Sequence, residues 1–289
     1  MKDWRNDVTG QRELVAWRKL VYVPIGDIDD PAVRAVTIDQ SDTALEAERL
    51  ARQRERALQQ SAARAKRTCR QKIKSAQFAS LLTCTYRENM QDFDKVRADW
   101  HSMLRKLQRV IPGFQAVYSF ERQVRGAWHV HAAIEKLPPF LMVPEGAGSK
   151  RLVRVRSWDY VRRLWRSIVG LDNGNIDIDG HRRTRHGMMG KYRPGESLAK
   201  LAGYVSKYLT KDYADGLSGR KRWGSTQGCK APKAITYIIP ECPFHELIEM
   251  AFHVPDGHRI VRHRIAPFGR IWMLYTEPGE PDVPLLSDF

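Results

Sequence analysis

The feature that most constrains the fold is the alternation of polar and apolar side chains along residues 127–134. Successive side chains of a strand point to opposite faces, so His129 and His131 share one face. The other face carries apolar residues that can enter a core: Trp128, Val130, Ala132 and Ile134. The pattern predicts a strand with one apolar face and two imidazoles about 6 to 7 Å apart on the other. An ordinary pair of half-buried histidines is the alternative interpretation.

A second strand-like run, residues 116–121, ends on Glu121 and precedes a short stretch that contains Gly126. That stretch has the length and composition of a hairpin turn, which would lay Glu121 beside His129 and His131. Two imidazoles and one carboxylate can hold a divalent ion and leave coordination positions open. The sequence therefore predicts a metal site made of these three residues, without choosing among magnesium, manganese and zinc.

Residues 198–211 have the spacing of an amphipathic helix whose apolar stripe includes Leu201 and Val205. The neighbouring polar stripe follows intervals of three and four residues and consists of Tyr204, Lys207, Tyr208 and Lys211. The pattern predicts a helix that packs on a core and offers two tyrosines and two lysines to a partner. A surface helix with solvated lysines is the alternative.

These motifs resemble those of a known enzyme family. His129-Val130-His131 resembles the His-hydrophobe-His motif of HUH endonucleases. The tyrosine helix is similar to the two-tyrosine motif of their rolling-circle replication initiators (Rep), as in small single-stranded DNA bacteriophages and related plasmids. Residues 80–86, which close on Thr85 and Tyr86, are a candidate for the first family motif. The resemblance covers about residues 78–240.

The resemblance implies an α+β fold, in which helices pack on an antiparallel, RRM-like β-sheet. It also implies Mg²⁺ or Mn²⁺ at the metal site and single-stranded DNA at a replication origin as the partner. Tyr204 or Tyr208 would attack a phosphodiester and form a covalent 5′-phosphotyrosine, with Lys207 and Lys211 favouring the phenolate or binding phosphate. The chain has no G-x-x-x-x-G-K-[ST] phosphate loop, so a host helicase would unwind the duplex and a host polymerase would extend the 3′-hydroxyl.

The charge of the chain agrees with a nucleic-acid partner. Its 49 Lys and Arg against 33 Asp and Glu give a net charge of +16, which is typical of polyanion binders. Cations concentrate on two stretches that we expect to contact DNA: Arg182, Arg183, Arg185, Lys191 and Arg193, and then Arg220, Lys221 and Arg222. A generally basic protein without a role on nucleic acid is the alternative.

The periodic segments suggest three regions. Residues 1–75 contain a long, partly basic helix over 42–74, residues 76–240 form the nicking and joining domain, and residues 241–289 are an extension without assigned chemistry. Further helices are predicted over 91–110 and 157–169, packed on one face of a sheet with strands over 80–86, 115–122, 127–135, 175–179 and 235–239. Residues 137–150, rich in proline and glycine, are predicted to be a loop or insertion.

Cysteine usage and hydropathy bear on the compartment. The four cysteines have no paired metal spacing and are too few for a disulfide scaffold, which indicates reduced thiols. No apolar run is long enough to span a bilayer or act as a signal peptide. We expect a soluble protein in the cytosol of a bacterial host.

Other functions are compatible with parts of this pattern. An HUH relaxase or transposase would use the same metal site with one essential tyrosine. A non-catalytic DNA-binding regulator would explain the charge but leave Glu121, His129 and His131 without a purpose. A hydrolytic nuclease would cut DNA without a protein–DNA adduct.

Overall fold

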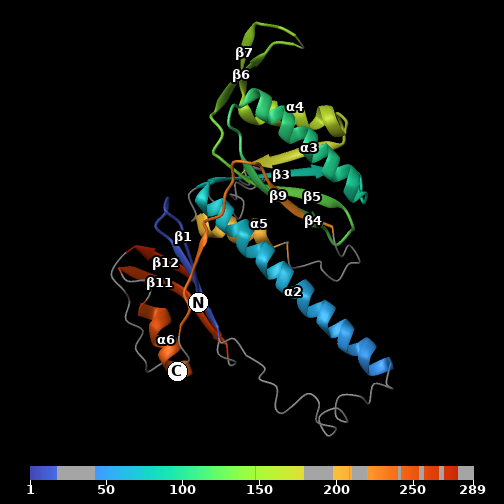
Figure 1. Cartoon of the computed structure of the whole chain (residues 1–289). Coiled ribbons are helices and arrows are strands. Elements are labelled where there is room, and N and C mark those ends of the chain that lie inside the picture. Colours follow the sequence, from blue (N-terminus) through green and yellow to red (C-terminus); the bar gives the residue numbers. More distant parts are fainter. Residues whose placement is uncertain are drawn as a thin grey trace, which may run out of the picture. The chain divides into compact units, whose positions relative to one another are not determined.

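The structure is a computed structural model that describes residues 1–17, 43–146, 148–178, 198–207, 209, 220–239, 242–253, 257–266 and 270–278. The chain divides into two compact units (Figure 1). One unit spans Ala62–Ala231, and the other combines Met1–Ser61 with Pro232–Phe289. Each unit has its own five-stranded sheet.

The sheet of the Ala62–Ala231 unit is antiparallel throughout, in the order β8-β3-β5-β4-β9. Its strands are β3 (Ser80–Tyr86), β4 (Ala116–Arg122), β5 (Trp128–Ile134), β8 (Gly174–Ile178) and β9 (Trp223–Ser225). The central strand β5 is buried along its whole length, so both of its faces are covered. The predicted strand over residues 127–135 is confirmed, and its alternation decides which side chains meet which layer.

One face of the sheet packs against α3 (Phe93–Val110) and α4 (Ser157–Val169). Trp100 from α3, Trp165 from α4 and Trp128 from β5 are almost completely buried in this layer. Trp100 lies edge-on to Tyr118 of β4, with ring centroids 5.3 Å apart. The apolar stripes predicted for both helices therefore form the main core.

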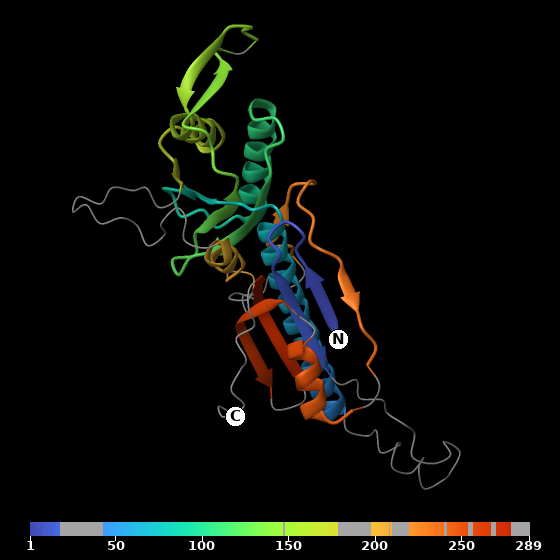
Figure 2. The same ribbon diagram turned by 90° about the vertical axis from the view of Figure 1, so that its left-hand side faces the viewer.

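The opposite face, which carries the histidines, packs against α5 (Leu198–Lys207) and the end of α2 (Thr43–Ser75). Leu201 and Val205 of α5 join Ile73 of α2 and Ala133 of β5 in a second apolar cluster. Both views show α5 on the side of the sheet opposite α3 and α4 (Figure 1, Figure 2). The α+β fold class is confirmed, but the prediction that helices pack on one face is wrong, because β5 has apolar residues on both faces.

A separate hairpin, β6 (Phe140–Pro144) and β7 (Leu152–Arg156), projects from the α4 end of this unit (Figure 1). The sequence prediction treated residues 137–150 as a loop or insertion, and this is wrong for β6. Its residues alternate between exposed and buried, with Leu141 and Val143 buried. The prolines that suggested a loop, Pro138 and Pro139, precede the strand.

The second unit joins the two ends of the chain in one sheet, in the order β10-β1-β2-β12-β11. Its elements are β1 (Lys2–Arg5), β2 (Arg12–Trp17), β10 (Ala234–Thr236), α6 (Phe244–His253), β11 (His258–Ala266) and β12 (Arg270–Pro278). Leu14 and Ala16 of β2 pack against Leu247 and Ala251 of α6. The strand predicted over 235–239 therefore pairs with β1 as β10 and does not belong to the histidine-bearing sheet.

These units differ from the predicted regions 1–75, 76–240 and 241–289, since the structure groups the two ends of the chain. Among the residues described, no helix combines the length and the apolar character needed to cross a membrane.

Candidate active site

The β4–β5 hairpin brings the three predicted metal ligands together. Its register sets Glu121 opposite His129 and Ser119 opposite His131. The Glu121 carboxylate reaches diagonally to His131, with 2.7 Å between Oε2 and Nε2. The two imidazole centroids are 6.4 Å apart. Both histidines are buried, at 8% and 4% exposure, so this cluster lies beneath α5 and not on an open surface.

Each histidine is oriented by a polar neighbour through its Nδ1 atom. Thr83 Oγ1 of β3 lies 3.1 Å from Nδ1 of His131, because the β3–β5 register places these residues side by side. The amide nitrogen of Gln123 lies 3.0 Å from Nδ1 of His129. Such contacts fix the rotation of each ring and select its tautomer.

The imidazole of His129 is kept neutral by its surroundings. Burial is the main cause that lowers the pKa of His129 to about 4, and the neighbouring His131 and Arg125 act in the same direction while Glu121 opposes them. Its Nε2 atom is buried and has no hydrogen-bond partner within the described residues. A neutral imidazole with an unused ring nitrogen is the form that binds metal ions.

The cluster is not a preassembled three-ligand centre. Among the residues that the structure describes, no three His, Cys, Asp or Glu side chains are grouped so as to hold a metal ion. Glu121 is bound to His131, while the Nδ1 side of His129 is bound to Gln123. Metal ligation by Glu121, His129 and His131 therefore stays a prediction.

Tyr204 lies next to this cluster. Its ring meets the His131 ring edge-on, with centroids 5.6 Å apart and planes at 88°. Helix α5 is held there by the apolar contacts of Leu201 and Val205 and by Ser119, whose hydroxyl donates to the Val205 carbonyl at 2.9 Å. Tyr204 remains 39% exposed, so a substrate can reach its side of the helix.

The remaining predicted residues are only partly within reach of the structure. Lys207 lies in the last turn of α5 and is exposed. Tyr208, Lys211, Arg182, Arg183, Arg185, Lys191 and Arg193 lie outside the described residues. Their predicted roles in catalysis and DNA binding stay predictions.

The second predicted DNA-binding stretch precedes and enters β9. Arg220 pairs with Asp94 at the start of α3, at 2.8 Å. Lys221 lies over the Trp223 ring at 5.8 Å, and Arg222 lies over the Trp128 ring at 5.7 Å. The three cations therefore sit at the β9 edge of the sheet, two of them against aromatic rings.

Sequence reasoning missed Thr83, Gln123 and Ser119 as supports of the site. Thr83 lies inside the run that we identified as the first family motif, and its register with His131 could be known only from strand pairing. Gln123 follows Glu121 by two positions and so shares its face, which is a usable signal. The hydroxyl of Ser119 became informative only once α5 was placed above it.

Comparison with known proteins adds one finding. Residues 79–213 match a family model described as a replication-associated protein of the ORF2 type. No curated protein and no solved structure matches the chain. The matched segment contains Glu121, His129, His131 and Tyr204, together with the β-sheet strands that carry the first three. Over this segment the chain is therefore similar to a family of replication-associated proteins, which supports a role in the initiation of DNA replication.

Proposed function

We propose that this protein is a rolling-circle replication initiator that nicks single-stranded DNA at an origin through a tyrosine and later rejoins the strand. The observation that carries the proposal is the edge-on packing of Tyr204 against His131, which is itself 2.7 Å from Glu121. An exposed phenol beside a buried pair of histidine and carboxylate brings a nucleophile to a site able to hold a cation. The similarity to replication-associated proteins supports the same role.

Glu121, His129 and His131 would hold the divalent ion, Mg²⁺ or Mn²⁺. When bound, such an ion would neutralise charge on the non-bridging phosphate oxygens. The unpartnered Nε2 of His129 fits this role, provided that Nδ1 carries the proton. A half-turn of the Gln123 amide would present its oxygen to that proton in place of its nitrogen.

The chain's own residues would then carry the covalent step. The Tyr204 hydroxyl loses its proton as its oxygen bonds to phosphorus, and the bond from phosphorus to the 3′-oxygen breaks, with that oxygen taking up a proton. Lys207, one turn further along α5, would bind the phosphate. The reverse reaction rejoins the strand without ATP, because the phosphotyrosine keeps the energy of the broken bond. A host polymerase would extend the 3′-end while a host helicase opens the duplex.

The test is a search for the covalent adduct. The purified protein is incubated with single-stranded oligonucleotides that tile the replicon encoding it, with Mn²⁺ or EDTA, and resolved on denaturing gels. We expect an adduct that requires the metal, survives in Tyr160→Phe, and disappears when Tyr204 and Tyr208 are both changed to Phe. Tyr160 is a suitable control because it lies on α4, on the other face of the sheet.

The same gels separate the competing functions. If one single Phe variant abolishes the adduct as completely as the double variant, a relaxase or transposase with one essential tyrosine replaces the two-tyrosine initiator. Cleavage without an adduct would indicate a hydrolytic nuclease. Binding without cleavage on the whole tiled set would leave a DNA-binding regulator.

A further inference from the structure

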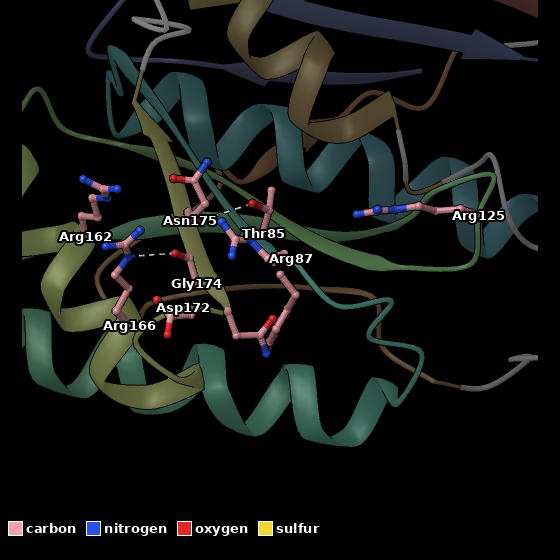
Figure 3. Close-up of a pocket in the computed structure, with 10 residues that line it drawn as sticks. Thr85, Arg87, Arg125, Arg162, Arg166, Asp172, Gly174 and Asn175 are labelled. Carbon is pink, nitrogen blue, oxygen red and sulfur yellow. Dashed lines mark hydrogen bonds between the residues drawn. The ribbon is translucent and has the colours of Figure 1, made fainter.

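A pocket of about 400 Å³ lies at the β8 edge of the histidine-bearing sheet. Its basic residues come from three segments: Arg87 follows β3, Arg125 lies in the β4–β5 turn, and Arg162 and Arg166 lie on α4. Figure 3 shows Arg162 and Arg166 beside each other, with Arg87 next to Thr85 and Arg125 reaching in from the turn. Asp172 is the single carboxylate of the lining. The pocket therefore has a strong positive charge.

This charge is poorly compensated by the protein. In the described part of the chain, none of the four guanidinium groups takes part in an ion pair. Nε of Arg166 donates to the Gly174 carbonyl at 3.0 Å, and Nε of Arg125 donates to Gln123 at 3.2 Å. Nε of Arg162 is buried and has no hydrogen-bond partner among the residues described. Clustered cations with an unused buried donor are stabilised when an anion binds between them.

The pocket is linked to the candidate active site by a short chain of hydrogen bonds. The side chain of Gln123 accepts from Arg125 through its oxygen and lies 3.0 Å from His129 through its nitrogen. Thr85, which also lines the pocket, lies two positions after Thr83 on the same face of β3, and Thr83 contacts His131. A polymer of regularly spaced phosphates could therefore occupy the active site and the pocket together.

We propose that this arginine pocket binds a phosphate group of the DNA strand that the active site cuts, and so positions that strand on the sheet. The proposal rests on the proposed function for the identity of the strand. Arginine suits this task because its planar guanidinium can donate two hydrogen bonds to one phosphate. The shared chemistry is a phosphate group, which could also come from inorganic phosphate or a free nucleotide, and the experiment separates these sources.

The experiment measures binding without catalysis, in protein whose Tyr204 and Tyr208 are both Phe and with EDTA present. Affinity for a single-stranded oligonucleotide is followed by fluorescence anisotropy over a series of salt concentrations. The test variant is Arg87→Gln with Arg162→Gln. The control is Arg109→Gln with Arg163→Gln, which removes the same charge from exposed arginines outside the pocket lining. Arg87→Gln alone is made as well, because Arg87 is exposed and its side chain has no hydrogen bond in the described structure.

We expect the pocket variant to weaken binding about tenfold more than the control and to reduce the salt slope by about 0.7 for one lost phosphate contact. The single Arg87→Gln variant should fall in between. Equal losses in the pocket and control variants would overturn the proposal, because the arginines would then contribute only general positive charge.

Inorganic phosphate and a deoxynucleoside monophosphate are titrated against the wild-type chain by calorimetry. A strand-specific pocket binds neither of them tightly enough to displace the oligonucleotide. Tight binding of the free anions, lost in the pocket variant while oligonucleotide affinity is unchanged, would reject the strand as ligand. Failure of the nicking proposal is distinguishable, since it removes the adduct of the wild type but leaves this binding difference intact.

Discussion

At the scale of single residues, His129 combines burial with a ring nitrogen that has no partner in the described structure. Burial disfavours the imidazolium, and the positive charge of Arg125 acts in the same direction. His131, by contrast, is paired with Glu121 and Thr83. The two histidines of one motif are therefore in different states, and they can be tested separately.

The protonation of His129 gives a pH prediction for metal-free protein. Its pKa is lowered from 6.5 to about 4, so the unfolded chain takes up the proton first as the pH falls. The contribution of His129 to stability is therefore present above about pH 6.5 and is lost between there and about pH 4. An NMR titration of the imidazole should show this low pKa, and Arg125→Gln should raise it while Arg109→Gln leaves it unchanged. A titration of His129 near 6.5 would contradict the burial argument.

The hydroxyl of Thr83 gives a prediction on metal affinity. Thr83→Val keeps the β-branched shape of the strand residue but removes the group 3.1 Å from His131 Nδ1. Because such supports orient a metal ligand, we expect Mn²⁺ affinity, measured by calorimetry, to fall by about tenfold or more. Thr85→Val is the matched control, since its hydroxyl donates to the Asn175 carbonyl and not to a histidine. Equal Mn²⁺ affinities in the two variants would remove Thr83 from the site.

At the scale of elements, close approach of strands and helices holds the tyrosine over the histidines. Helix α5 contacts β4 and β5, and its buried residues Leu201, Ala202 and Val205 face the sheet. On the other side of β4, the edge strand β9 approaches closely where Gly224 pairs with Tyr118. The ring of Tyr118 is itself held by Trp100 and by a contact between its hydroxyl and His101.

Two glycine substitutions should therefore have opposite effects on stability. A Cβ atom at Gly224 would lie 2.6 Å from Cζ of Tyr118, so Gly224→Ala should lower the free energy of unfolding by about 1–3 kcal/mol. Gly203, within α5, has nothing within 4 Å of such a Cβ atom. Gly203→Ala should therefore raise stability by about 0.5–1 kcal/mol through helix propensity. Urea unfolding measures both, and a neutral Gly224→Ala would show that β9 can move away at little cost.

At the scale of the whole molecule, the chain ends form a unit with its own core and its own buried charge. Asp3 is fully buried in β1, with Arg12 of β2 at 2.6 Å and Arg5 at 2.9 Å. Removing one partner of a buried ion pair costs far more than removing an exposed pair. Stability changes in one unit can therefore be set against those in the other.

Asp3→Asn should destabilise the end-to-end unit by about 3–5 kcal/mol, because the Arg12 guanidinium loses the carboxylate that it contacts in the interior. Asp94→Asn, which breaks the exposed pair with Arg220, should cost at most about 1 kcal/mol. Hydrogen exchange followed by mass spectrometry should place the effect of Asp3→Asn in residues 1–17 and 232–278. Equal loss of protection in residues 80–134 would mean that the two units unfold together.

Much of the fold could be read from local patterns. The strands over residues 80–86 and 128–134 and the helices over 93–110 and 157–169 have strong periodicity, which belongs to one segment and survives in any tertiary context. The pairing of Glu121 with His129 was also predictable, because a short turn joins the two strands. The candidate metal residues and Tyr204 were found in this way.

The sequence by itself determined these elements, the α+β class and the neighbourhood of Glu121, His129 and His131. Only the tertiary structure decided that β10 pairs with β1, that Thr83 supports His131, and that the arginines of three segments line one pocket. The physical reason is that strands pair through backbone groups that nearly every residue carries alike, so a strand pattern does not specify its partner. Contacts between distant segments follow from the packing of the whole core, in which α5 lies over the histidines because both faces of β5 must be covered.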